Sequence, residues 1–297
     1  MEFQEHLATR IKVVNEFLAG YMERDGIAES ETLREAMKHA LFSGGKRFRP
    51  ILAIASAEVF SVPMERVMPT ACALELIHTY SLIHDDLPSL DDDDFRRGKP
   101  TAHRVFGEGM AVLAGDALLT AAFGLIAENG RVPGVTERQV LDVVADVARA
   151  CGAAGMVGGQ AIDIASTGTE LDQNGIEMMD RLKTGALIAV SARVGAILGG
   201  ASKSDIESIT DYGQCLGIAF QIGDDVLDAV GDESKMGKRV RKDAEKQKNS
   251  MVRVLGVDGA RERARYYIGE AKRAVNKFGE RANAVVKLAD LVLNRES

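Results

Sequence analysis

The chain has 297 residues, of which 46% are hydrophobic and 27% are charged, as in an ordinary globular protein with a sizeable core. Its formal net charge is −7 and no basic stripe is visible, which excludes a general nucleic-acid binder, because such proteins use Lys and Arg to release counterions from phosphates. No linker or shift in composition divides the chain, so we expect one domain over residues 1–297.

The repeating signal along the chain is helical. Apolar residues recur three and four positions apart from residue 3 to residue 21, which predicts an amphipathic helix. Further helical stretches are predicted over residues 32–42, 50–60, 64–87, 109–128, 137–164, 176–198, 204–230, 260–278 and 281–293. Gly and Pro separate these stretches, and clear alternating strands are missing. We therefore predict an all-α fold of about ten or more helices, several of them apolar around most of their circumference and hence central.

The amino terminus is acidic and polar, whereas a secretory signal needs a basic start and an apolar run. Asp116 and Arg193 interrupt the longest apolar stretches, so none reaches the ~18 uncharged residues expected of a membrane span. The three cysteines are scattered in apolar segments without a CxxC pair, as is typical of core thiols in a reducing compartment. We expect a cytoplasmic protein with no membrane span.

Two aspartate-rich motifs lie roughly 140 residues apart: DDLPSLD at residues 85–91, followed by three more aspartates at 92–94, and DDVLD at residues 224–228. Each follows an apolar helical stretch that would carry its carboxylates toward a common interior. Carboxylate oxygens favour Mg²⁺, which is typically held by one or two carboxylates together with substrate phosphates. The pair of motifs predicts a polyphosphate substrate. Residues 92–94 either join this site or form an exposed acidic turn.

The spacing within the two motifs differs. Asp224 and Asp228 are four residues apart, so on a continuous helix they lie on the same face and can share metal ions. Asp85 and Asp91 are six apart, which at ~100° per residue places them on different faces of an ideal helix. Pro88 cannot continue that helix cleanly, because its ring clashes with the carbonyl four residues before it. We therefore expect a bend that returns Asp91 to the site.

Basic residues accompany the two motifs. GGKRFRP at residues 44–50 is a glycine-led turn ahead of a helix, where backbone amides and cations can meet an anion. Arg96 and Arg97 follow the first aspartate run closely, and Lys183 and Lys238 add cations elsewhere. A single cation of this kind is more often a solvated charge, but their joint occurrence with two aspartate motifs favours a site for an anion.

Taken in order, these motifs resemble those of a known family. They are GGKRFRP (44–50), His78, SLIHDDLPSLD (81–91), RRG (96–98), Gly115-Asp116, GQ (159–160) with Asp163, KTG (183–185) and FQIGDDVLD (220–228). The set is similar to that of the trans-isoprenyl diphosphate synthases, most closely the bacterial short-chain type that includes farnesyl diphosphate synthase, and it covers nearly the whole chain. The resemblance implies an isoprenoid-synthase helical bundle around a deep central cavity, usually a homodimer, with one aspartate motif on each side of the cavity mouth.

The resemblance also implies the chemistry. Isopentenyl diphosphate would add head to tail to dimethylallyl and then geranyl diphosphate, giving farnesyl diphosphate, and the proton at C2 would leave with the departing diphosphate. Asp85, Asp91, Asp224 and Lys183 would be catalytic. Three Mg²⁺ ions, or Mn²⁺ in their place, would be held by Asp85, Asp86, Asp91, Asp224, Asp225 and Asp228. Isopentenyl diphosphate would be bound by Lys46, Arg49, His78 and Arg97. The allylic diphosphate would be bound by Arg96, Lys183, Thr184, Gln221, Lys238 and Lys248.

Tyr80 lies five residues before Asp85, the position that in this family resembles a floor to the pocket for the growing chain. Helical spacing alone leaves this open, since Ser81 lies closer to the face of Asp85, and Tyr80 could instead pack between core helices. The chain departs from the family pattern at Arg241, where a glycine is customary, and at residues 249–251, where NSM replaces a common STY. These departures make Lys248 a weaker candidate than Lys238.

Other functions have partial support. A geranylgeranyl diphosphate synthase would share every motif. A class I terpene cyclase shares the first motif but resembles NxxxSxxxE at the second, where this chain has DDxxD. A histidine-aspartate phosphohydrolase would use His84-Asp85, but it needs several metal-binding histidines, and His6, His39 and His103 are poorly placed for that. A non-catalytic partner subunit would be expected to have lost part of a motif, and both motifs are intact.

Overall fold

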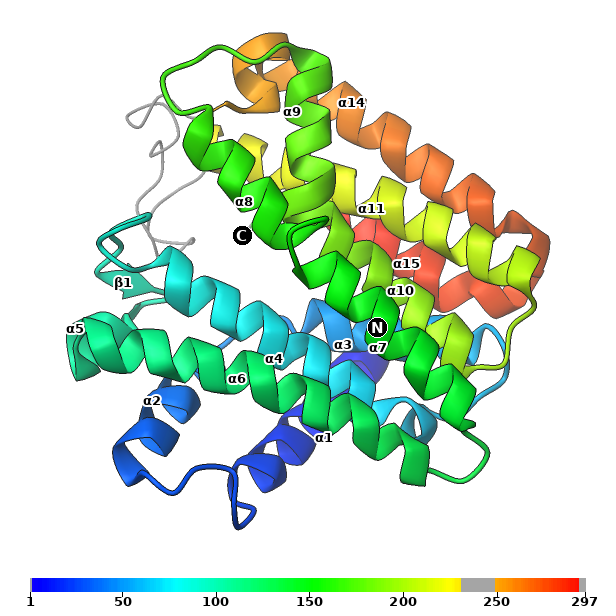
Figure 1. The fold of residues 1–297 in the computed structure, drawn as a ribbon. Helices are drawn as coiled ribbons and strands as arrows, with labels where there is room; N and C mark the ends of the chain where they lie inside the picture. Colours follow the sequence, from blue (N-terminus) through cyan, green and yellow to red (C-terminus); the bar gives the residue numbers. More distant parts are fainter. Residues whose placement is uncertain (1, 231–248, 294–297) are drawn as a thin grey trace.

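The computed structural model describes residues 2–230 and 249–293, which form a helical bundle with one short two-stranded hairpin (Figure 1). The first part contains α1 (Glu2–Met22), α2 (Glu31–Leu41), α3 (Phe48–Glu58), η1 (Met64–Arg66), α4 (Met68–Asp85), β1 (Phe95–Arg96), β2 (Lys99–Pro100), α5 (Ala102–Phe106), α6 (Glu108–Glu128), η2 (Asn129–Arg131) and α7 (Glu137–Cys151). The second part contains α8 (Met156–Ala165), α9 (Gln173–Asp180), the π-helical turn η3 (Arg181–Gly185), α10 (Ala186–Leu198), α11 (Lys203–Val230), α14 (Met251–Val275), η4 (Asn276–Ala282) and α15 (Asn283–Leu293). The predicted all-α class is confirmed.

Helix starts follow from capping side chains. At α7, the Thr136 hydroxyl accepts a hydrogen bond from the Gln139 amide at 3.2 Å, while Gln139 Oε1 accepts from the Thr136 amide at 2.9 Å. At α2, the Ser30 hydroxyl accepts from the Leu33 amide at 3.4 Å. Such caps satisfy amides that have no partner inside the helix, and each is worth about 1 kcal/mol.

The core lies around α3, α4 and α10. Most residues of these three helices are buried, as predicted for segments that are apolar around most of their circumference. α10 packs against α3, α7 and α11, and α4 packs against α6; Figure 1 shows α4 and α6 running side by side. A Cβ on Gly195 of α10 would lie 2.2 Å from the Ala53 carbonyl oxygen of α3, so this glycine allows the two backbones to approach closely.

Three predicted helical stretches differ from the observed elements. The stretch 137–164 is divided between α7 and α8 by a turn over residues 152–155, where a Cβ on Gly155 would meet the Ala150 carbonyl oxygen at 2.1 Å. The stretch 176–198 is interrupted by the π-helical turn. α14 begins at Met251, before the predicted residue 260, and kinks at Gly256, whose φ is +69°. Apolar periodicity continues through each interruption, so it could not reveal them.

One helical segment, Glu108–Arg131, is long and apolar enough to cross a membrane by length and composition, with a mean hydropathy of 1.9. The segment contains Asp116, so it is not an uninterrupted run of uncharged residues, as the sequence indicated. The core helix of a soluble protein can pass the same test, and α6 packs against α2, α4 and α5. Part of its surface is nevertheless exposed and apolar, notably at Val112 and Leu113.

Candidate active site

A cavity of about 630 Å³ opens among the ends of α3 and α4, the segment 90–97, α8, η3 and α11. Fourteen of the residues predicted from the sequence line it: Arg49, His78, Tyr80, Ser81, Asp85, Asp91, Arg96, Arg97, Lys183, Thr184, Gln221, Asp224, Asp225 and Asp228. Asp86 and Lys46 are not among the lining residues. Lys238, Lys248 and Arg241 lie outside the described residues. The fold thus brings most of the predicted set around one space.

The first aspartate motif bends as its sequence predicted. α4 ends at Asp85, and the chain folds back so that the Asp91 amide donates to the Asp85 carbonyl oxygen at 2.8 Å. The Asp92 amide donates to the Leu87 carbonyl oxygen at 3.1 Å, and Asp92 has a φ of +49°. Asp92 and Asp94 are exposed, while Asp93 is buried. The exposed-turn interpretation therefore describes Asp92 and Asp94.

Asp85 is a poorly solvated carboxylate. Burial raises its pKa to about 6, with Asp91 adding to the shift and Lys183 opposing it. A cation beside this carboxylate would remove the cost of ionising it. Hard carboxylate oxygens on both sides of the cavity are the donor set that Mg²⁺ prefers, so the residues fit such an ion. Among the described residues, no three His, Cys, Asp or Glu side chains form a metal site by themselves.

Asp86 and Arg96 are paired with each other. Arg96 Nε donates to the two Asp86 carboxylate oxygens at 2.7 and 2.9 Å, and Asp86 is only 4% exposed. From the sequence, Asp86 was predicted to bind the metal and Arg96 to bind the allylic diphosphate. The ion pair between them was not predicted. The pair joins the end of α4 to β1, and it fixes the guanidinium at the edge of the cavity.

Lys183 is presented by the π-helical turn η3. Its Nζ lies 2.5 Å from Asp163 Oδ2 on α8, and Asp163 is 6% exposed. A Cβ on Gly159 would lie 2.2 Å from the Lys183 backbone nitrogen, so only glycine lets α8 pass this close. Single π-turns are common at functional sites. The sequence singled out Gly159 and Asp163 as part of a motif but gave them no role; their partner is Lys183.

A chain of hydrogen bonds ties the second aspartate motif to this turn. The Thr184 hydroxyl donates to Gln221 Oε1 at 2.6 Å, and Gln221 Nε2 donates to Asp225 Oδ1 at 2.9 Å. The other Asp225 oxygen accepts from the Met251 amide at 2.9 Å. Each Asp225 oxygen therefore accepts a hydrogen bond from the protein, which orients the carboxylate and leaves lone pairs on both oxygens.

The unusual Asn249 lies just before Met251. Its side-chain oxygen accepts from the Leu171 amide at 3.0 Å, and its nitrogen donates to the carbonyl oxygens of Ser166 and Thr169 at 3.2 and 2.9 Å. Asn249 is 6% exposed, so these three bonds satisfy a buried side-chain amide. They also hold the loop after α8 against the start of α14. The sequence marked this position only as a departure from a pattern.

The glycine-led turn at 44–46 faces Arg97. Arg97 Nη1 donates to the Gly44 carbonyl oxygen, and a Cβ on Gly45 would lie 2.5 Å from the same nitrogen. Arg49 Nε is buried without a hydrogen-bond partner among the described residues. Burial lowers the pKa of Arg49 to about 10, so it stays protonated at neutral pH. Burial and the nearby Arg49 and Arg97 charges lower the pKa of His78 well below its usual range, so its imidazole is neutral.

Tyr80 lies at the side of the cavity that α4 forms. It is 6% exposed, and its ring meets the His84 ring edge to face at a centroid distance of 5.7 Å. His84 Nε2 lies 3.1 Å from the Val112 carbonyl oxygen, and a Cβ on Gly115 would lie 2.1 Å from this nitrogen. Gly115 therefore makes room on α6 for His84, which in turn supports Tyr80. Ser81 also lines the cavity, and its hydroxyl donates to the His78 carbonyl oxygen.

Comparison with known proteins gives consistent results. Residues 30–287 match the polyprenyl synthetase family. Farnesyl diphosphate synthase of Geobacillus stearothermophilus is 40% identical over 299 residues, covering 100% of this chain and 99% of that protein. Geranylgeranyl diphosphate synthase of Cyanophora paradoxa is 42% identical over 264 residues, covering 89% of this chain and 87% of that protein. Among solved structures, the geranyltransferase from Helicobacter pylori complexed with magnesium and isoprenyl diphosphate is 28% identical, with a TM-score of 0.84 over 99% of this chain and 97% of that one.

The family match spans most of the chain, and the relatives cover it almost end to end. The cavity also gathers the ordered motifs that carried the resemblance. The chain therefore belongs to the polyprenyl synthetase family, as a short-chain prenyl diphosphate synthase.

Proposed function

We propose that the protein is a farnesyl diphosphate synthase, which adds isopentenyl diphosphate to dimethylallyl diphosphate and then to geranyl diphosphate. The observation that carries this proposal is one cavity with aspartates on two sides, cations between them and the Tyr80 ring at its wall. Diphosphate groups suit the charged part of the cavity, and an isoprenoid chain suits the apolar part formed by Tyr80 and by Met156, Ala161 and Ile164 of α8.

The charged part would hold the allylic diphosphate between the two aspartate motifs. Three Mg²⁺ ions bound by Asp85, Asp91, Asp224 and Asp228, with Asp86 and Asp225 assisting, would neutralise the charge that develops on the leaving diphosphate. Lys183 and Arg96 add positive charge to that diphosphate, while Thr184 and Gln221 orient it. Lys238 and Lys248 are proposed for the same group from the sequence alone.

Isopentenyl diphosphate would bind at the opposite side, near Arg49, Arg97, Lys46 and His78. Two guanidiniums can bind phosphate oxygens with paired hydrogen bonds, and a neutral imidazole can donate one more. The double bond then attacks the allylic carbon as the carbon–oxygen bond to diphosphate breaks. The C2 proton of the condensed product passes to the departing diphosphate, so no protein base is needed.

The length of the product follows from the wall at Tyr80. A buried ring is rigid and bulky, and tightly packed interiors yield little to a longer chain. We propose that this wall stops elongation after two additions. Relatives of similar identity include both farnesyl and geranylgeranyl diphosphate synthases, so geranylgeranyl diphosphate is the competing product.

One incubation tests these proposals. The protein is mixed with Mg²⁺, dimethylallyl diphosphate and labelled isopentenyl diphosphate, and the products are dephosphorylated and separated by chromatography. Farnesol as the main product supports the proposal, and geranylgeraniol assigns the longer product. A hydrocarbon, free phosphate alone or no product would refute prenyl elongation in favour of cyclisation, hydrolysis or a non-catalytic role.

We also propose that the protein is a cytoplasmic homodimer. The exposed apolar residues Val112 and Leu113 of α6 supply a surface that a second copy could cover. The location rests on the three scattered cysteines, which form no CxxC pair.

A further inference from the structure

We propose that Arg47 is a positioning residue that sets the affinity for isopentenyl diphosphate. It would act by fixing the turn that carries Lys46 and Arg49, without touching the substrate. The inference rests on the proposed function, because it assumes that this turn holds that diphosphate. Arg47 lies outside the cavity lining and was given no role by the sequence.

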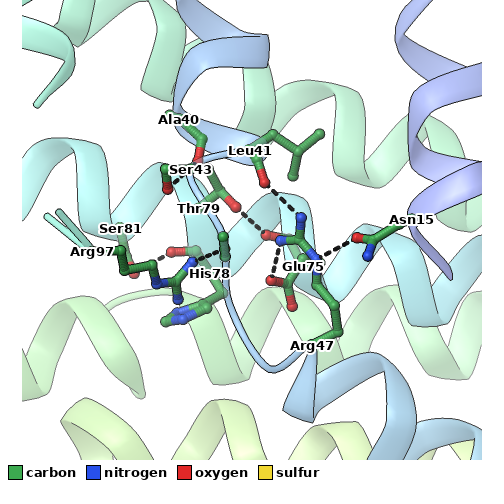
Figure 2. Close-up of polar contacts among 11 residues, drawn as sticks. Asn15, Ala40, Leu41, Ser43, Arg47, Glu75, His78, Thr79, Ser81 and Arg97 are labelled. Atoms are coloured by element: carbon green, nitrogen blue, oxygen red, sulfur yellow. Dashed lines mark hydrogen bonds and ion pairs between the residues drawn. The ribbon is translucent and has the colours of Figure 1, made fainter. Parts of the chain in front are cut away.

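The guanidinium of Arg47 joins four helices. Its Nε donates to Asn15 Oδ1 of α1, its Nη1 to Glu75 Oε1 of α4 and its Nη2 to the Leu41 carbonyl oxygen at the end of α2, each at 2.8 Å. The residue itself is the N-cap of α3. Figure 2 shows the three bonds spreading from one side chain at the bend between α2 and α3. The fork geometry of arginine makes this three-way attachment possible.

The backbone at Arg47 is strained and held in place. Its φ of +49° and ψ of +36° lie in the left-handed region, which costs a residue with a Cβ roughly 1 kcal/mol or more. Such a conformation persists only where the surroundings determine it. The left-handed residue turns the Arg47 side chain into the interior between an exposed Lys46 and a buried Arg49 that lines the cavity. The tether therefore decides where both of these cations point.

The contact with Arg47 also neutralises the buried negative charge of Glu75. Glu75 is 2% exposed and Arg47 is 4% exposed, so the pair is removed from solvent. Glu75 also lies near enough to Arg49 and Arg97 to influence both. Because Glu75 is hydrogen-bonded to Arg47, those two guanidiniums remain directed toward the cavity. Loss of Arg47 would leave an unpaired buried carboxylate beside them, which is costly and would compete with the ligand.

Calorimetric titration with isopentenyl diphosphate alone measures this affinity without turnover. Arg47→Met should raise its Kd about tenfold, which corresponds to ~1.4 kcal/mol. In steady-state assays, KM for isopentenyl diphosphate should rise by a similar factor, while KM for dimethylallyl diphosphate stays within about twofold. Arg47→Lys keeps the charge but not the fork, so it should fold and still bind more weakly than the parent. A parental Kd in both variants would overturn the inference.

Two further variants separate positioning from general destabilisation. Arg10 and Glu58 form a matched ion pair between α1 and α3 at the other end of α3. Arg10→Met should lower the melting temperature without changing the Kd for isopentenyl diphosphate; an equal rise in Kd would show that the Arg47 effect is only structural. The double variant Arg47→Met/Glu75→Met removes both buried charges. This double variant should still bind isopentenyl diphosphate more weakly than the parent. Recovery of the parental Kd would show that the unpaired Glu75 charge, and not the loss of the Arg47 tether, weakens binding in Arg47→Met.

The parent protein distinguishes this inference from the proposed function. If the parent binds isopentenyl diphosphate but elongates nothing, the proposed function fails while the Kd comparison still decides the role of Arg47. If the parent elongates normally and both Arg47 variants bind isopentenyl diphosphate as the parent does, only the inference fails. A parent that does not bind isopentenyl diphosphate refutes both.

Discussion

Among single residues, Asp85 links stability to pH most directly. Its pKa in the folded protein is about 6 against an ordinary 3.8. The folded state therefore keeps the proton that the unfolded chain releases, and stability falls as pH rises from about 4 to 6. We expect Asp85→Asn, measured without metal, to melt a few degrees higher than the parent at pH 8 and at the same temperature near pH 4. Equal melting temperatures at pH 8 would contradict this burial argument.

The same carboxylate should be indispensable for catalysis. Asp85→Ala or Asp224→Ala removes a proposed ligand for the ions that stabilise the leaving group, and each decade of rate corresponds to ~1.4 kcal/mol. We expect turnover to fall by orders of magnitude in proteins that remain folded by circular dichroism. Asp92→Asn is the matched control, because Asp92 is exposed and adjacent to Asp91. Near-parental turnover in either alanine variant would remove that residue from the metal site.

Tyr80 permits a test of product length. Tyr80→Ala should open the cavity wall and shift products from farnesyl toward geranylgeranyl diphosphate or longer, at a cost in stability from the new cavity. Tyr80→Phe keeps the ring and should keep the parental products. Chromatography of dephosphorylated products measures both. An unchanged distribution in Tyr80→Ala would place the stopping point elsewhere and leave Tyr80 as a core residue.

At the scale of elements, the close contact between α8 and the π-helical turn positions Lys183. Alanine at Gly159 would place a Cβ 2.2 Å from the Lys183 backbone nitrogen, so one of the two elements must move. Gly159→Ala should therefore lower both the melting temperature and turnover. Gly20→Ala on α1 meets nothing within 4 Å and should stabilise the protein by roughly 0.5–1 kcal/mol. If Gly159→Ala has the melting temperature and turnover of the parent, the close contact between α8 and the π-helical turn does not position Lys183.

Helix periodicity predicts the elements well and their interruptions poorly. The spacing of apolar residues identified α1 and α11 because apolar side chains along each helix pack on the core. It missed the break between α7 and α8 and the π-turn at 181–185, because a buried chain stays apolar on both sides of a local distortion. The hairpin formed by β1 and β2 has two residues in each strand, too few to show alternation.

At the scale of the whole molecule, the sequence predicted which residues gather but not how they pair. Aspartates and cations of chemically recognisable motifs line one cavity. The partners Asp86 with Arg96, Lys183 with Asp163 and Arg47 with Glu75 are separated by 10, 20 and 28 positions. Such contacts depend on how the elements pack in three dimensions, which composition and spacing do not encode. The bend at Pro88 was predictable because proline chemistry acts locally.

Assembly is the remaining property of the whole molecule that the surface predicts. Leu113 is 54% exposed and Val112 40% exposed on α6, and the neighbouring Val105 of α5 is 49% exposed. Exposed apolar side chains of this kind are costly in water and are typical of the central part of a homodimer interface. Asp116, also exposed on α6, would be placed poorly in a lipid interior, which favours a protein partner over a membrane.

We therefore expect light scattering after gel filtration to give twice the 31.9 kDa mass of the chain. Leu113→Glu should shift the protein to the monomer, because a charge at the centre of an apolar interface would be buried without a partner. Leu141→Glu on α7 is the matched control, since Leu141 is even more exposed, at 65%, but lies on another helix. A monomeric parent would refute the dimer, whereas a dimeric Leu113→Glu variant would move the interface away from this face of α6.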